Sequence, residues 1–313
     1  MKGSWAASNI TTRCVFFAEK VIQSPTSYLE GLNGETYTTK YNTDGTTPGF
    51  KYIFTIEGEN KGESVFEVQH YYDAEWDWLT SKGNSLNVFS TVRSYTNEQG
   101  ETVGLGGWGF NCPTKDLLNE FEQGDPRLPI TIGKQGDSIW AFINTKTVKV
   151  PMNFSLSPTG MSCRKYEVHP FYYWSKAKPH PDDGPTNNKM MRLADVYLMA
   201  AEAYLESGNS AMALDYVNQV RTRARNSGST GVPENLTAIT FQDIVHERRV
   251  ELALEYGRFP DLVRWRLAEA ELNGTARSSG EAINFVAEKH EFFPIHNDNI
   301  LSSNGNIKQN NGY

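Results

Sequence analysis

The sequence feature that most constrains the fold is a pair of helix-length segments joined by a dipeptide that ends helices. The first segment, residues 192–207, repeats apolar or aromatic side chains at helical spacing: Leu193, Val196, Tyr197, Ala200, Ala203 and Tyr204. Gly208-Asn209 follows it and favours a stop. The second segment, residues 210–225, does the same with Ala213, Leu214, Val217 and Val220. So short a link predicts two antiparallel helices packed on each other.

This helix pair is similar to one tetratricopeptide unit, and no second copy of it follows in the chain. Because a lone pair cannot bury both of its faces, we expect it to pack against another part of the protein. A third helix is expected over residues 241–256, with Thr240 as its N-cap and Asp243 completing a near capping box. A further helix is expected over residues 14–23, where Ser24-Pro25 ends the apolar pattern.

The part of the chain between these helices is dominated by loop composition. Glycine, threonine and asparagine are frequent, and short alternating runs at residues 64–69, 139–143 and 147–150 predict strands. Residues 115–123 predict a short helix. The predicted fold class is therefore mostly α with long irregular loops and short β-strands. We divide the chain into residues 1–30, a loop-rich region at 31–189, and a helical part at 190–313.

Composition narrows the choice of partner. Aromatic residues make up 12% of the chain while hydrophobic residues reach 38%, which suggests that some aromatic surface is exposed. The formal net charge of −7, with no basic run, disfavours nucleic acid as a partner. Cys14, Cys112 and Cys163 are too widely spaced to indicate a disulfide framework or a zinc site, and we expect three buried thiols.

The aromatic and acidic run at residues 71–78 is the candidate ligand site. A pyranose presents an apolar face of C–H groups and a rim of hydroxyls, so it is bound by a flat aromatic ring flanked by carboxylates or amides. Within eight residues the run offers four aromatic rings and three acids directly after a predicted strand. The alternative is that the tryptophans pack beneath the long loops. The predicted ligand residues are Trp76 and Trp78, supported by Tyr71, Tyr72 and Asp73.

Other aromatic residues fit core packing better than ligand binding. Residues 171–174 form a second aromatic run before a proline-rich loop, and Trp140 lies within a predicted strand. No cofactor or metal is indicated. The glycines of residues 104–109 match a dinucleotide-binding pattern, but no hydrophobic strand precedes them and Pro113 follows. His246-Glu247 begins like a zinc-protease helix, but Val250 replaces the second histidine.

The charged residues of the third helix are expected to be structural. Glutamates and arginines recur there at spacings that permit ion pairs along one helix. We predict a network with Arg258, Asp261 and Arg264 rather than a set of catalytic acids. The helix residues concerned are Glu247, Arg248, Arg249, Glu251 and Glu255.

Four segments, in order along residues 105–313, resemble the RagB/SusD family. They are Gly107-Trp108-Gly109-Phe110 with the following Pro113 to Arg127 stretch, Arg192 to Ala203, Glu247 to Ala253 running into Arg258 to Trp265, and the closing Phe293-Pro294-Ile295 with Lys308 to Tyr313. One departure is Tyr256, which stands between the Glu and Gly that are usually adjacent in the family. The resemblance assigns residues 104–109 to a structural turn and residues 1–30 to the remnant of N-terminal repeat helices.

The resemblance implies a lipid-anchored protein on the outer membrane of Bacteroidetes. Such proteins cap a TonB-dependent transporter of the SusC type and deliver oligosaccharides or polysaccharides to it. A signal peptide, a lipid-bearing cysteine and most N-terminal repeat helices of the family are missing from this sequence. We therefore expect a truncated form, a cleavage product or a misplaced start.

The predicted function is non-catalytic glycan binding at the cell surface. One alternative is a glycoside hydrolase, which needs two carboxylates across the scissile bond. Its nominal candidates are Asp73, Glu75, Asp77, Asp182 and Asp183. The other alternative is a protein-interaction scaffold or peptide-binding protein of the same family, without a sugar site.

Overall fold

The computed structural model describes residues 4–40, 42–71, 82–91, 93, 95–96, 99–103, 107–143, 146–167, 183–275 and 280–313. The chain forms two compact units, Met1–Leu254 and Glu255–Tyr313, which are described separately below. The division of the sequence at residues 30 and 189 stays a prediction.

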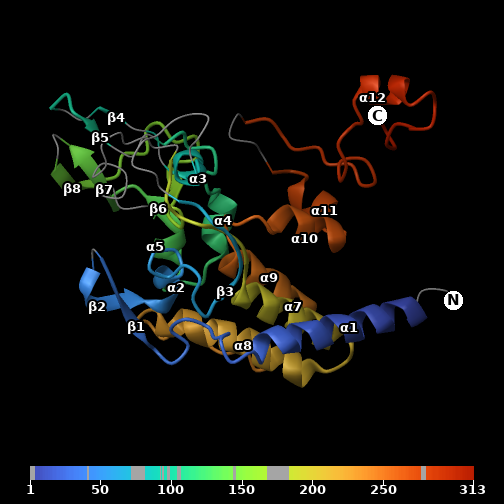
Figure 1. The fold of residues 1–313 in the computed structure, drawn as a ribbon, viewed down its shortest axis with the longest axis horizontal. Coiled ribbons are helices and arrows are strands. Elements are labelled where there is room, and N and C mark those ends of the chain that lie inside the picture. Colours follow the sequence, from blue (N-terminus) through green and yellow to red (C-terminus); the bar gives the residue numbers. More distant parts are fainter. Residues whose placement is uncertain are drawn as a thin grey trace. The chain divides into compact units, whose positions relative to one another are not determined.

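The first unit combines helices with short strands (Figure 1). Its described helices are α1 (Ser4–Ile22), α2 (Gly49–Tyr52), α3 (Leu86–Ser90), α4 (Lys115–Glu120), α5 (Leu128–Thr131), α7 (Leu193–Glu206), α8 (Ser210–Asn226) and α9 (Phe241–Glu251). Its described strands are β1 (Thr36–Thr39), β2 (Asn42–Pro48), β3 (Ser64–Val68), β4 (Tyr95–Thr96), β5 (Thr102–Val103), β6 (Ile132–Lys134), β7 (Ser138–Ile143), β8 (Lys146–Pro151), β9 (Met161–Cys163) and β10 (Asn188–Arg192). This is the mostly α fold with short strands that the sequence predicts.

The predicted antiparallel helix pair is confirmed as α7 and α8, and α7 also packs against α1 and α9 (Figure 1). The apolar stripe of α7 is buried, with Leu193, Leu198 and Ala200 fully inaccessible, and it forms the main core together with Val217 of α8. Gly208 ends α7 with a φ of +84°, a conformation that glycine adopts without strain. The other faces of the pair are thus covered by helices from both ends of the unit.

The strands pair in twos, always antiparallel, among the described residues. The pair that matters most for the site is β3 with β10, because it joins segments about 120 residues apart in sequence and leads directly into α7. Val68 at the end of β3 lies opposite Asn188 at the start of β10. The chain therefore leaves β3 and enters β10 at the same end of this strand pair.

Helix α9 ends at Glu251, earlier than the sequence-predicted end near Tyr256. The capping box at its start is present as predicted, with Thr240 accepting a hydrogen bond from the Asp243 amide. The Glu251 carbonyl instead accepts hydrogen bonds from Lys165 Nζ at 2.8 Å and Arg192 Nη2 at 3.1 Å. Side chains from elsewhere in the fold thus take the acceptor that a continuing helix would use.

A buried network of ion pairs links the helices to the loop-rich part of the first unit. Arg192 bridges Glu63 at 2.8 Å and Glu251 at 3.0 Å, and Arg223 also pairs with both of these carboxylates. Arg127 bridges Glu247 at 2.5 Å and Glu251 at 3.1 Å. Because a buried charge is tolerated only when it is paired, these side chains hold their segments in fixed relative positions.

The prediction that Glu247 and Glu251 pair with Arg258 and Arg264 is wrong. Their arginine partners come instead from α8, from the start of α7 and from the segment before α5. Helix spacing alone suggested neighbours along the chain, whereas α9 is buried and meets side chains brought by distant elements. In the second unit, Arg258 pairs with Glu271 and Arg264 with Asp261.

The second unit contains α10 (Arg258–Arg264), α11 (Ala268–Leu272) and α12 (Asn297–Ser302) as its described helices. Leu262, Ala268 and Phe285 form its small apolar core. In the described parts of both units, every helix is too short or too polar to cross a lipid bilayer.

Candidate functional site

Tyr71 is the one predicted ligand residue that lies within the described part of the chain, and its side chain is 65% exposed. It follows β3 by three residues. Tyr72, Asp73, Trp76 and Trp78 lie outside the described residues. The ends of that stretch, however, are described and show where it is attached.

Both ends of residues 72–81 are fixed at the end of the β3–β10 pair. The Tyr71 amide donates to the Lys82 carbonyl at 3.0 Å, so the chain leaves and re-enters at one place. The preceding His70 amide donates to Asn187 Oδ1 at 2.9 Å, which links this place to the segment before β10. The described residues on either side of the predicted ligand stretch are therefore linked to each other and to the segment before β10 by hydrogen bonds.

The second aromatic run, residues 171–174, lies in an undescribed stretch that ends at the same place. Asn84 and Gly184 exchange backbone hydrogen bonds of 3.0 and 2.7 Å, and the Gly83 amide donates to Asp183 Oδ1 at 2.9 Å. A Cβ on Gly83 would come within 2.5 Å of the Asp183 carbonyl carbon, so this junction requires glycine. The described ends of both aromatic stretches thus meet within hydrogen-bonding distance.

Asp183, one of the nominal hydrolase carboxylates, is fully buried in this junction and accepts the Gly83 amide. Its role in the structure is to join two segments. Asp73, Glu75, Asp77 and Asp182 lie outside the described residues.

A partly exposed aromatic cluster lies directly after this junction. Phe89 of α3 contacts Trp108 with ring centroids 5.3 Å apart and Phe110 with centroids 5.9 Å apart. Trp108 is 46% exposed and Phe110 65% exposed. Backbone hydrogen bonds from Trp108 to Val88 and from Phe110 to Phe89 hold the two strands of chain together. The turn predicted at residues 104–109 lies partly outside the described residues and stays a prediction, while the described Trp108 and Phe110 present aromatic rings to solvent.

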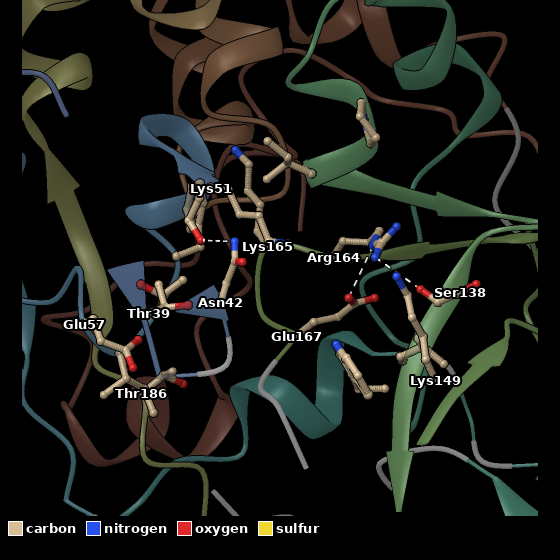
Figure 2. A pocket seen from close by; sticks show the side chains of 18 residues that line it. Thr39, Asn42, Lys51, Glu57, Ser138, Lys149, Arg164, Lys165, Glu167 and Thr186 are labelled. Carbon is tan, nitrogen blue, oxygen red and sulfur yellow. Dashed lines mark hydrogen bonds and ion pairs between the residues drawn. The ribbon is translucent and has the colours of Figure 1, made fainter. Parts of the chain in front are cut away.

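A cavity of about 400 Å³ opens elsewhere in the first unit, between the β1–β2 hairpin and the β7–β8 hairpin (Figure 2). Helix α2, the segment after it, α5 and residues 164–167 complete its walls. Its volume lies within the range of about 300–1,000 Å³ usual for small-molecule sites. In Figure 2, Thr39, Asn42, Glu57 and Thr186 lie on one side of the cavity, and Ser138, Lys149, Arg164 and Glu167 on the other.

The second side of the cavity is rich in charge. Arg164 Nε lies 3.3 Å from Glu167 Oε2, and its Nη2 donates to the Ser138 carbonyl at 3.3 Å. Burial raises the pKa of Glu167 against the opposing charge of Arg164. The Lys51 side chain reaches solvent, yet the surrounding protein lowers its pKa by desolvation and the charge of Arg164 lowers it further.

Two expectations about single side chains are wrong. Trp140 lines the cavity and is 42% exposed, whereas its strand position suggested the core. Cys14 is exposed and Cys112 half-buried, and Cys163 alone of the three is buried. In both cases the element carrying the residue has a solvent-facing side that the local pattern did not reveal.

Comparison with known proteins decides the family. The sequence model of the SusD family matches residues 62–313, which is most of the chain. The chain belongs to the SusD family. The resemblance read from residues 105–313 is thereby confirmed and extended toward the N-terminus.

Individual relatives of this SusD-family chain agree with that assignment. The chain is similar to the SusD-like protein P2 of Formosa agariphila, with 27% identity over 75% of this chain and 46% of that protein. Its structure resembles surface glycan-binding protein A of Bacteroides thetaiotaomicron in complex with laminarihexaose, with a TM-score of 0.71, 21% identity, and coverage of 97% of this chain and 61% of the other. It also resembles a laminarin-binding SusD-like protein, with a TM-score of 0.64, 26% identity, and coverage of 98% and 62%. The chain spans about half the length of the curated relative and about three fifths of the solved structures.

The sequence missed two features that the fold of this SusD-family chain assembles. The aromatic cluster could have been noticed from Trp108 and Phe110, which stand one residue apart among glycines in a polar loop. The cavity has no local signal, because its lining residues come from several segments between Thr39 and Thr186.

Proposed function

We propose that this protein binds oligosaccharides or polysaccharides at the bacterial cell surface and performs no chemistry on them. Support comes from membership of the SusD family together with a laminarin-binding relative of the same fold. Of the alternatives, the glycoside hydrolase has one candidate carboxylate fewer, because Asp183 is buried and accepts a hydrogen bond from the Gly83 amide. A peptide-binding or scaffold role has no specific observation in its favour.

We place the ligand at residues 71–78, with Trp76 and Trp78 as the rings against the sugar and Tyr71, Tyr72 and Asp73 beside them. The observation that carries this placement is the junction at the end of the β3–β10 pair. There, residues 83–84, just after the first aromatic stretch, are hydrogen-bonded to residues 183–184, just after the second. Phe89 follows this junction in the chain, and the exposed rings of Trp108 and Phe110 pack against Phe89. Aromatic rings attached at this junction would suit a sugar's apolar face.

Substitution of Trp76 tests the site. We expect Trp76→Ala to weaken binding of laminarihexaose or another recognised oligosaccharide at least about tenfold, or roughly 1.4 kcal/mol, because a ring that stacks on the ligand is removed. Isothermal titration calorimetry measures the affinity, after a panel of neutral glycans has identified a ligand. Phe17→Ala, which removes a 62% exposed ring from α1, is the matched control and should leave affinity unchanged.

Two results would overturn parts of this proposal. Unchanged affinity in Trp76→Ala would remove residues 71–78 as the site. Release of shortened oligosaccharides at catalytic rates during incubation with the protein would show that it is an enzyme.

The longer protein, in this proposal, is lipid-anchored at the outer membrane and passes its ligand to a SusC-like TonB-dependent transporter. Family membership supports this. Purification of the full-length protein from its native membrane should recover such a transporter with it, and its consistent absence would contradict the proposed delivery step.

A further inference from the structure

We propose that the cavity between the β1–β2 and β7–β8 hairpins binds an anionic sugar unit, with a carboxylate or sulfate group held against Lys51, Lys149 and Arg164. That the ligand is a saccharide rests on the proposed function. That it carries a negative charge rests on the cavity alone. Tyr71, the described residue of the predicted ligand stretch, does not line this cavity. An anion site here would add affinity for acidic glycans.

The first argument is the excess of positive charge at this one place. Four basic and two acidic side chains line the cavity, although the chain as a whole has a net charge of −7. The side-chain ammonium groups of Lys51 and Lys149 make no hydrogen bond or ion pair with any described residue. Ammonium groups that face a concave, partly desolvated space without an acceptor favour an anion there, because charge-assisted hydrogen bonds are stronger than neutral ones.

The proximity of the three cations is the second argument. Desolvation lowers the pKa of Lys51 most; the charges of Arg164 and Lys149 lower it further, and the charge of Glu167 opposes them, so all three groups lie near enough to Lys51 to act on it. In Figure 2, Lys149 and Arg164 lie on one side of the cavity together with Glu167, and Lys51 comes from α2 on the side of Asn42. Like charges held together raise the free energy of the empty site, and a bound anion would relieve that repulsion.

The remaining walls suit a sugar better than a simple inorganic anion. The opposite side offers hydroxyl and amide groups from Thr39, Asn42 and Thr186, which match a ring that carries several hydroxyls. The carboxylate of Glu167 also lines the cavity. Sugar hydroxyls can donate hydrogen bonds to a carboxylate, whereas sulfate or phosphate ions at neutral pH are mainly acceptors. The exposed ring of Trp140 adds an aromatic surface for the C–H face.

The two lysines can be changed without disturbing the fold. Arg164 contributes to structure through Glu167 and Ser138, so its substitution would mix folding with binding. Lys51 and Lys149 take part in no contact of that kind among the described residues. Lys51→Gln, Lys149→Gln and the double variant therefore test the site, and Lys134→Gln, at the end of β6, removes an exposed charge that does not line the cavity.

The experiment measures binding of three classes of oligosaccharide by isothermal titration calorimetry. One carries carboxylates (oligogalacturonate), one carries sulfate esters (a sulfated galactan fragment), and one is neutral (laminarihexaose). We expect at least one anionic class to bind, about tenfold more weakly in each single lysine variant and more weakly still in the double variant. Affinity for the neutral ligand should be the same in all variants. The anionic class that binds tells whether the site accepts carboxylate or sulfate.

Three outcomes would overturn the inference: neither anionic class binds, the double variant binds anionic ligands as tightly as the parent, or Lys134→Gln weakens binding equally. The last would show a general effect of charge rather than a site. These outcomes differ from failure of the proposed function. If neutral glycans bind through Trp76 and anionic ones do not bind, only the cavity assignment is lost. If anionic glycans bind through the lysines and Trp76→Ala changes nothing, only residues 71–78 are lost.

Discussion

Glu251 shows how much of this fold depends on single buried charges. Its carboxylate contacts three arginines, Arg127, Arg192 and Arg223, and it is fully inaccessible to solvent. Burial by itself would raise the pKa of Glu251, but the surrounding charges of Arg223 and Arg192 outweigh burial and hold the pKa well below its ordinary value. Replacing this carboxylate with a neutral group of the same shape would leave the buried arginines without their counter-charge.

We expect Glu251→Gln to lower the free energy of unfolding by about 3–5 kcal/mol, because one partner of a buried ion network is removed while the others stay buried. Urea denaturation measures the change. Glu206→Gln, at the exposed end of α7, is the control and should change stability by less than about 0.5 kcal/mol. Similar values for the two variants would show that the network does not stabilise the fold.

The pH dependence of the same variants gives a second readout. The folded-state pKa of Glu251 is depressed, so its contribution is present above the unfolded-state pKa of about 4.3 and is lost as pH falls below that value. Between about pH 5 and pH 3, the parent should therefore lose stability more steeply than Glu251→Gln. Parallel curves would contradict the ion-pair origin of the shift.

At the scale of elements, α9 is the helix that carries both central carboxylates, and its first turn sets where they point. The capping box closes the helix start, since Thr240 accepts the Asp243 amide while Asp243 Oδ2 accepts the Thr240 amide at 2.7 Å. From there, Glu247 and Glu251 follow one turn apart and are both fully buried. The position of the cap thus determines which residues of α9 meet the arginines.

Thr240→Ala should lower the free energy of unfolding by about 1 kcal/mol, because the side chain that satisfies the first-turn amide is lost. Thr237→Ala, three residues earlier and exposed, is the matched control and should have almost no effect. Chemical denaturation of both variants makes the comparison. An equal, small loss in both would mean that tertiary packing alone holds the start of α9.

At the scale of the whole molecule, the chain consists of two units whose hydrophobic cores differ in size. The first is organised around α7, whose apolar face is buried by α1, α8 and α9. The second has a core of only a few side chains in its described part, around Leu262 and Phe285, and it leaves Phe293 and Leu301 92% and 75% exposed. A small core provides little burial free energy, so local opening should be easier in the second unit.

Hydrogen exchange of the intact chain tests this difference. We expect the amides of α7 and α8 to exchange most slowly and those of α10 and α11 at least about a hundredfold faster, because opening of the second unit exposes less apolar surface. Helix α9 packs on α7 and is intermediate in length between α7 and α10, so its amides provide an internal reference for the effect of helix length on exchange. Equal protection of α10 and α7 would show that the two units open as one.

The sequence by itself determined the elements whose pattern is local. The stripe of α7, the Gly208 stop, α8 and the Thr240 cap depend on spacings within a few residues, and each lies where the sequence predicts it. The family could also be recognised, because its motifs are short and occur in order. The aromatic run at residues 71–78 is equally local, and its role as a ligand site stays a prediction.

Tertiary structure alone decided the partners. Glu251 was expected to pair with neighbours in sequence, and it meets Arg127, Arg192 and Arg223 because three distant segments converge on α9. Trp140 is exposed because its hairpin forms one wall of a cavity to which the β1–β2 hairpin, about a hundred residues earlier, contributes the other. Contacts between distant segments produce no repeating pattern in the sequence, so sequence spacing cannot predict them. The free energy of such a contact depends on how the segments pack in space and not on their separation along the chain.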